Sequence, residues 1–150
     1  MAFNKFGLLT MEQVENLEKE MGQKFPDDYR SFLLKTNGGM FDFEDEHGFE
    51  VEPIDEEDIY IDTLFGDREI TGSNLIYWNK KYGEDAWENS IIIGNTISDG
   101  FILYLCSGEG SGIYFWDDNY AYECTSDEQN AYFICDTFDE LLKLANIKID

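Results

Sequence analysis

The spacing of apolar residues changes after residue 36, from a helical repeat near the start of the chain to an alternating repeat. Residues 10–21 and 26–36 place apolar side chains every three or four positions, as amphipathic helices do. In residues 41–44 and 49–52, apolar and acidic residues alternate instead. Alternation is typical of strands that have one face on a core and the other in water. This order predicts two helices followed by a sheet.

Residues at the predicted helix ends agree with these boundaries. Thr10 and Gln13 have the spacing of a capping box, and Gly22 suits the left-handed residue that follows a helix. Pro26 stands where a second helix can begin, and that helix should end at residues 37–39, which accept positive φ. Because the link between the two helices is so short, we expect them to form a hairpin.

The second half of the chain predicts an antiparallel meander that is closed by a helix. Short apolar runs bounded by turn residues mark its strands at residues 91–93, 101–105, 113–116 and 131–134. Residues 120–122 should pair briefly, and residues 70–89 should form a helical or irregular cover for the sheet. Thr137 and Glu140 repeat the capping-box spacing and open the last helix.

Together these elements predict an α+β fold in which an N-terminal helical hairpin and a C-terminal helix pack against a mainly antiparallel β-sheet. Because the helices and strands do not alternate, we expect the helices on one side of the sheet. No linker interrupts the chain, so residues 1–150 should form a single domain.

The charge of the chain limits the class of partner. Its 33 Asp and Glu residues outnumber 10 Lys and Arg residues, which gives a formal net charge of -23. Nucleic acid and anionic membrane surfaces both require a basic binding face, so neither is expected as a direct partner. The acidic surplus favours a cationic protein, which long-range attraction would bring in quickly. With 12 Phe, 9 Tyr and 3 Trp, the chain is too aromatic for a disordered acidic tail.

The same composition leads to an expectation about compartment and cofactors. The first six residues open no long apolar run, and no stretch approaches 18 apolar residues, so we expect neither a signal peptide nor a membrane span. The three cysteines include no CxxC pair, which favours reduced thiols in a cytoplasmic protein. One His and three scattered Cys do not supply a structural zinc site, and no other cofactor is expected.

Three features of the first half stand together: a glutamate-bearing first helix, a link that ends in Pro26-Asp27-Asp28-Tyr29, and an Asn-Gly-Gly end to the second helix. They resemble the pattern of the SUKH superfamily, which includes proteins of polymorphic toxin systems and a yeast regulator of cell-wall synthesis. Met21 and Phe25 stand where leucine is commoner in the family. The resemblance covers most of the chain and includes residues 14–18, 21–29, 32–33, 37–39, 91–94, 99–100, 114–117 and 136–142.

The resemblance implies a mixed α/β binding fold without catalysis. Many bacterial relatives are immunity proteins that bind a cognate toxin, often a nuclease, and keep it from killing the producing cell or its kin. Eukaryotic relatives act in signalling and cell-wall regulation through protein contacts. We therefore expect an immunity protein that binds a toxin with a basic surface; the alternative is a non-catalytic scaffold or regulator of cell-wall synthesis or signalling.

Acidic residues are densest between residues 41 and 62, where 11 of 22 residues are Asp or Glu. In an extended strand Glu50 and Glu52 would point the same way, about 7 Å apart, above Phe49 and Val51. Such a ridge would enter the groove where a nuclease binds phosphates; the alternative is a solvated face that only aids solubility. The predicted partner-binding residues are Asp42, Glu44, Asp45, Glu46, Glu50, Glu52, Asp55, Glu56, Glu57 and Asp58.

A second acidic sector lies in the loops of the meander. Between Lys81 and Lys143 there are 13 carboxylates and no Lys or Arg. Tyrosines in this sector would be rigid interface anchors, although ordinary sheet residues explain them equally well. The secondary partner-binding prediction is Asp117, Asp118, Tyr120 and Tyr122.

Other site chemistries have weaker support in the sequence. Asp42, Glu44 and Glu46 alternate as calcium ligands do, but Gly48 comes one place late for an EF-hand loop. The glycine-rich residues 107–112 join two predicted strands, so a hairpin loop explains them better than a nucleotide loop. Cys106 could form a catalytic dyad with His47, the one histidine, or it could be a buried structural thiol. The many paired carboxylates do not exclude a hydrolase. Trp78, Trp87 and Trp116 are expected in the core.

Overall fold

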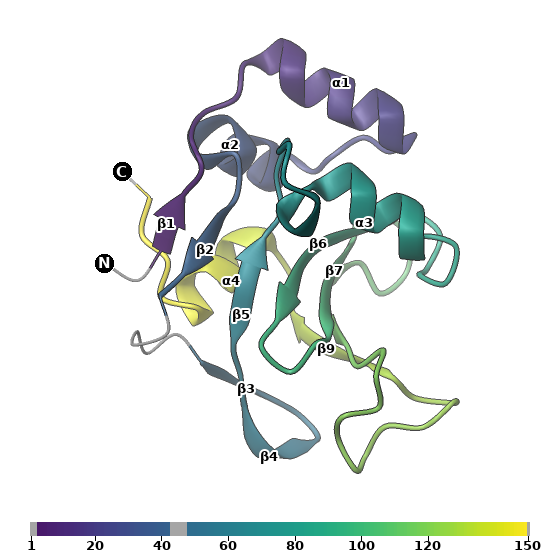
Figure 1. Ribbon diagram of the computed structural model, residues 1–150. Helices are drawn as coiled ribbons and strands as arrows, with labels where there is room; N and C mark the ends of the chain where they lie inside the picture. The colour runs from purple at the N-terminus through teal and green to yellow at the C-terminus, as the bar shows by residue number, and fades with distance from the viewer. Residues whose placement is uncertain (1–2, 43–47, 150) are drawn as a thin grey trace.

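A seven-stranded antiparallel sheet forms the centre of the computed structural model, which describes residues 3–42 and 48–149 (Figure 1). Its strands lie in the order β1-β2-β5-β6-β7-β8-β9. A separate two-stranded hairpin consists of β3 and β4. The strands are β1 Phe3–Lys5, β2 Gly39–Phe41, β3 Phe49–Val51, β4 Ile54–Ile59, β5 Ile61–Leu64, β6 Ser90–Thr96, β7 Phe101–Leu105, β8 Gly112–Trp116 and β9 Ala131–Cys135.

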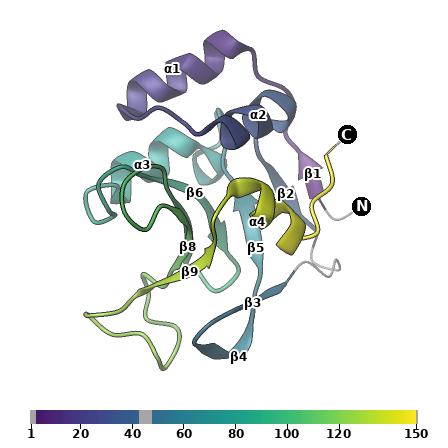
Figure 2. The ribbon, with the colours of Figure 1, turned by 180° about the vertical axis from the view of Figure 1, so that it is seen from behind.

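Helices cover the sheet on both faces, which corrects the expectation that they share one side (Figures 1 and 2). On one face Tyr29 of α2 packs against Tyr104 of β7, with ring centroids 6.3 Å apart. On the other face Trp78 of α3 packs against Phe101, 5.5 Å away. The helices are α1 Met11–Met21, α2 Asp27–Thr36, α3 Leu75–Tyr82 and α4 Phe138–Leu144, with a 3-10 turn η1 at Thr71–Ser73.

The reason for the two-sided cover lies in β7. Its first four residues, Phe101 to Tyr104, are all buried, although successive side chains point to opposite faces of a sheet. A strand that is apolar on both sides needs cover on both sides. Residues 75–82 supply the second cover as α3, which lies within the segment 70–89 that was predicted to cover the sheet.

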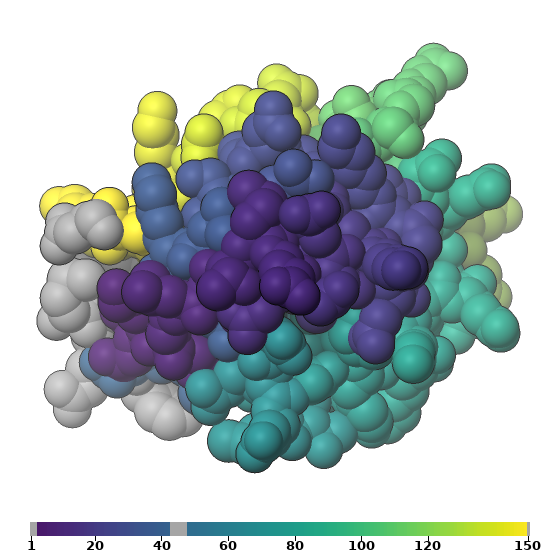
Figure 3. Space-filling view, turned by 90° about the horizontal axis from the view of Figure 1, so that it is seen from above, coloured from purple at the N-terminus to yellow at the C-terminus, as the bar shows by residue number. Residues whose placement is uncertain are grey.

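The predicted helix boundaries are confirmed. Thr10 and Gln13 form a capping box at the start of α1, and Gly22 ends that helix with φ 65°. Asn37 ends α2 with φ 52°. Across the short link, the Glu18 carboxylate accepts hydrogen bonds from the Phe25 backbone N–H (2.7 Å) and from the Arg30 guanidinium. These contacts fix the predicted helical hairpin, and α1 also reaches α3. Seen from above in Figure 1, the purple, blue and teal segments that contain α1, α2 and α3 occupy the centre of the visible surface (Figure 3).

The Asp28 carboxylate joins three elements that are far apart in the sequence. One oxygen accepts a hydrogen bond from the Tyr104 hydroxyl at 3.0 Å, and the other accepts one from the Phe138 backbone N–H at 2.8 Å. The first contact ties α2 to β7, and the second caps the N-terminus of α4. Within the described ranges, none of the helices has the length and apolar character needed to cross a membrane.

The shorter strands differ from those predicted. The acidic run 55–58 lies inside β4, and β1 has no counterpart among the predicted strands. Tyr120 and Tyr122, expected to pair briefly, belong to no strand and lie in a long loop, residues 117–130, between β8 and β9. Pro53 follows the end of β3 in the turn to β4. Residues 43 and 44 of the first alternating segment lie outside the described residues.

Candidate partner-binding surface

The acidic hairpin, defined as residues 49–59, extends from the lower end of the sheet in Figure 1. Its strands pair through Phe49 with Ile59 and through Val51 with Ile54, and these four apolar side chains are buried. In β3 this burial turns Glu50, between Phe49 and Val51, outward. In β4 all four acidic residues between Ile54 and Ile59 are exposed. The hairpin is therefore attached to the core by its apolar side chains and presents its charges to solvent.

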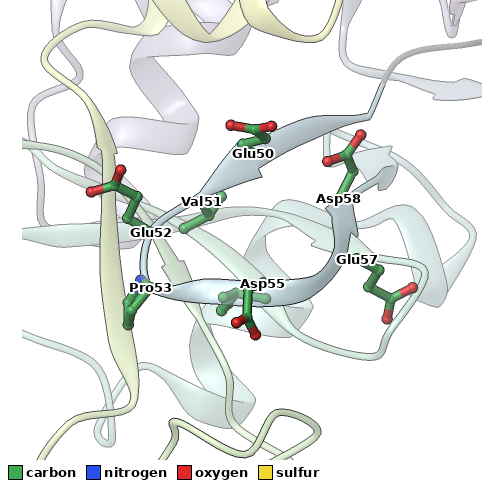
Figure 4. A pocket seen from close by; sticks show the side chains of 8 residues that line it. Glu50, Val51, Glu52, Pro53, Asp55, Glu57 and Asp58 are labelled. Atoms are coloured by element: carbon green, nitrogen blue, oxygen red, sulfur yellow. The ribbon is translucent and has the colours of Figure 1, made fainter.

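Six predicted carboxylates are brought together on this hairpin, and all six are exposed: Glu50, Glu52, Asp55, Glu56, Glu57 and Asp58. Together with Val51, Pro53 and Ile54, most of them line a hollow of about 340 Å³ (Figure 4). Glu52 lies in the turn beyond β3, so the expected ridge of Glu50 and Glu52 on one strand is wrong. Asp42, at the end of β2, is exposed and accepts a hydrogen bond from Asn4 at 2.9 Å. Glu44, Asp45 and Glu46 lie outside the described residues.

The second acidic sector, in the loop of residues 117–130, adjoins the acidic hairpin. The Tyr122 hydroxyl donates a hydrogen bond to Glu57 at 3.0 Å, and the Glu123 backbone N–H donates one to Glu56 at 3.3 Å. Burial, assisted by the Glu57 charge, raises the pKa of Tyr122 to about 12, so this hydroxyl stays protonated and remains a donor. Two acidic segments that are some 60 residues apart in the chain thus form one surface.

Two of the four secondary predictions are corrected by burial. Asp117 is fully buried, and its carboxylate accepts hydrogen bonds from the backbone N–H groups of Ala121 (2.9 Å) and Tyr122 (3.1 Å) and from the Thr125 hydroxyl. Tyr122 is only 5% exposed. Neither side chain is accessible to a partner. Both side chains stabilise the loop. The Asp117 carboxylate, which was predicted to lie at the surface, instead accepts hydrogen bonds from donors within the loop.

Asp118 and Tyr120 remain at the surface. Tyr120 is 47% exposed, and its hydroxyl donates to Asp127. The pKa of Asp118 is raised, first by partial burial and then by the neighbouring charges of Asp85 and Asp117. Negative charges in this part of the loop therefore repel one another.

Partial burial and this repulsion together make the contribution of Asp118 to the stability of the protein depend on pH. A carboxyl group with a raised pKa in the folded state lowers stability once it ionises, and the loss disappears below its ordinary pKa of about 3.9. We expect Asp118→Asn to raise the free energy of unfolding at pH 7 and to leave it unchanged near pH 3. Urea denaturation of both proteins at the two pH values measures the difference. An equal gain at both pH values would contradict this explanation.

Two apolar side chains in this region were missed by the sequence reasoning. Ile97 is 52% exposed in the turn between β6 and β7, and Tyr60 is 37% exposed at the end of the acidic hairpin. The Ile97 backbone N–H donates to the Tyr60 carbonyl at 3.0 Å, so the two residues adjoin. Ile97 stands in a short turn of otherwise polar residues, and that pattern could have indicated an exposed apolar side chain.

The positive charges of the chain lie elsewhere. Residues 48–62 contain seven carboxylates and residues 117–130 contain five, and neither segment has a Lys or Arg. Glu18 with Arg30 is the one ion pair among residues 3–42 and 48–149. Six of the ten cations belong to the opposite, helical end of the molecule (Figure 1): Lys19, Lys24, Arg30, Lys35, Lys80 and Lys81. Among residues 3–42 and 48–149, no Lys or Arg therefore pairs with a carboxylate of the acidic surface.

The remaining candidates fit structural roles. The Cys106 thiol donates a hydrogen bond to the Tyr104 carbonyl. Burial, and then the nearby charge of Asp28, raise the pKa of this thiol to about 12, so it stays protonated. Residue 47, the other half of the dyad considered above, lies outside the described residues. The glycine-rich residues form the predicted hairpin loop, between β7 and β8. Trp116 is buried and Trp78 partly buried, whereas Trp87 is 43% exposed and does not belong to the core.

Sequence comparison identifies the family. No curated protein matches the chain. The family model described as SMI1 / KNR4 family (SUKH-1) matches residues 8–144, which include all four helices and every strand from β2 to β9. This match confirms the resemblance carried by the first two helices and the later strands, and the chain belongs to the SMI1/KNR4 family (SUKH-1).

Proposed function

We propose that this protein is a cytoplasmic immunity protein that neutralises a cognate toxin domain by stoichiometric binding, without catalysis. The observation that supports the proposal most directly is the joining of the acidic hairpin to the loop of residues 117–130, which makes one acidic surface. A toxin that binds nucleic acid carries a basic groove. The carboxylates would occupy that groove in place of phosphates.

Binding would proceed in two stages. Long-range attraction between the acidic surface and the basic toxin speeds the encounter, as charge complementarity does in other protein pairs. Exposed apolar side chains within the surface, Tyr60, Ile97 and Tyr120, then supply the desolvated contacts that hold a complex together. The substrate groove of the toxin is closed by the bound protein, and no chemical step is needed.

Co-expression tests the proposal. Cells that produce the toxin domain encoded beside this gene should survive only when this protein is also produced, and the two proteins should co-purify in a 1:1 complex. A toxin variant that is catalytically dead should bind equally well, since the proposal requires binding alone. Survival without a complex, or a complex that leaves the toxin active, would contradict the proposal, as would capture of only a cell-wall or signalling protein.

A further inference from the structure

An aromatic hollow lies on the sheet face that α3 covers only in part. α3 packs over Phe101 at one end of this face. Farther along the same face Tyr114 is half-buried, and its partner across the strands, Phe133, is 48% exposed. A hollow of about 510 Å³ at this place is lined by Trp87, Glu88, Ser107, Gly108, Glu109 and Tyr114, among others.

Three aromatic rings form a row along this face. The rings of Trp87 and Tyr114 meet at 89° with centroids 4.7 Å apart, and those of Tyr114 and Phe133 meet at 75° with centroids 5.5 Å apart. Trp87 is 43% exposed, the largest exposed side chain in the described part of the chain. Exposed rings in contact with one another present faces on which a planar or cationic group can stack.

The segments that hold these rings are fixed by hydrogen bonds. The Ser90 backbone N–H donates to the Trp87 carbonyl at 3.2 Å, and Asn89 takes a left-handed conformation with φ 65°. The Cys106 backbone N–H donates to the Asn89 carbonyl at 2.9 Å, which ties the Trp87 turn to the end of β7. On the other wall, the Tyr114 hydroxyl donates to the Gly110 carbonyl. The hollow is therefore formed before any ligand arrives.

The charge of the hollow limits what it can hold. Glu88 and Glu109 line it, and no Lys or Arg occurs between residues 82 and 142. A buried apolar ligand would have to strip water from both carboxylates, which is unfavourable. A second copy of this chain has the same formal net charge of -23, so the two copies would repel each other at this site. A cation that stacks on the rings and pairs with the carboxylates suits both features.

We propose that the aromatic hollow binds an arginine side chain of a protein partner, with the guanidinium stacked on the exposed ring of Trp87, beside the edge-to-face ring of Tyr114, and paired with Glu88 and Glu109. Arginine fits better than lysine because its guanidinium is planar, stacks on aromatic faces and meets carboxylates with two parallel hydrogen bonds. The proposal rests on the proposed function only in taking the partner to be a basic protein. The hollow would then be a second contact, on a different face from the acidic hairpin.

A peptide titration tests the proposal without the toxin. The probes are the acetylated, amidated tripeptides Gly-Arg-Gly and Gly-citrulline-Gly, which differ mainly in charge, added to the 15N-labelled protein at low salt. We expect the arginine peptide to shift the Trp87 indole N–H and the Ser107 and Gly108 amides, and to bind about fivefold or more tightly than the citrulline peptide. Trp87→Leu and Glu109→Gln should each weaken binding severalfold. Glu128→Gln, an exposed carboxylate on the loop of residues 117–130, is the matched control and should leave it unchanged.

Four outcomes would overturn the proposal. They are equal binding of the two peptides, shifts confined to the acidic hairpin, no effect of Trp87→Leu, and shifts that depend on protein concentration and not on peptide, which would indicate self-association. None of these four outcomes would change the expected result of the co-expression test, because that test does not depend on the hollow. Conversely, failure of the toxin to bind would leave the peptide result standing.

Discussion

Reversing three charges on the acidic hairpin should slow association with the cognate toxin at least tenfold. The variant is Glu50→Lys, Glu52→Lys and Asp58→Lys, which changes exposed side chains with no hydrogen bond among the described residues. Electrostatic steering raises association rates by about 10- to 1,000-fold, and local reversal converts attraction into repulsion. Stopped-flow mixing with the catalytically dead toxin measures the association rate directly.

The choice of residues keeps the loop contact intact. Glu56 and Glu57 accept hydrogen bonds from Glu123 and Tyr122, so replacing them would also disturb the loop of residues 117–130. Glu50, Glu52 and Asp58 avoid that complication. Any change in rate can then be assigned to charge rather than to a displaced loop.

A matched control separates local charge from total charge. Glu12→Lys, Glu15→Lys and Glu20→Lys change three exposed carboxylates on α1, at the helical end. Each triple variant raises the formal net charge by six, from -23 to -17. We expect the α1 variant to slow association much less, and the salt dependence of the rate to fall only for the hairpin variant. Equal slowing by both variants would mean that net charge alone guides the toxin.

Local sequence signals predicted the elements whose boundaries depend on a few neighbouring residues. The capping box at Thr10 and the left-handed residues Gly22 and Asn37 act within one helical turn, and all three are confirmed. The position of α3 on the opposite sheet face depends on how Trp78 meets Phe101, some 20 residues away. No local pattern carries that information, so the two-sided cover of the sheet was not predictable.

The candidate surface shows the same division between local and distant information. Alternation around Phe49 and Val51 correctly placed Glu50 in solvent, because a buried strand residue turns its neighbours outward. The contact of Tyr122 with Glu57 joins residues 65 positions apart and had no signal in the sequence. Burial of Asp117 was equally hidden, because its neighbour Asp118 has the same charge and remains partly exposed.

Asp117→Ala should lower the free energy of unfolding by about 3 kcal/mol and release the loop of residues 117–130 from the acidic hairpin. The substitution removes the acceptor of three hydrogen bonds and leaves the N–H of Tyr122 in a buried site without its partner. A hydrogen bond to a charged group contributes about 1.5–3 kcal/mol, and part of the loss is returned because a buried charge no longer has to be desolvated. Urea denaturation measures the loss.

The adjacent carboxylate supplies the control. Asp118→Ala changes a residue of the same type and charge, one position along, that lacks the three hydrogen bonds of Asp117, and it should not destabilise the protein. Hydrogen exchange then locates the effect, since the amides of Ala121 and Tyr122 should lose protection only in Asp117→Ala. If the variant also binds the toxin more slowly, the loop contributes to docking through its shape, because the buried carboxylate cannot touch the partner. Similar stability of Asp117→Ala and Asp118→Ala would show instead that the loop is held without Asp117.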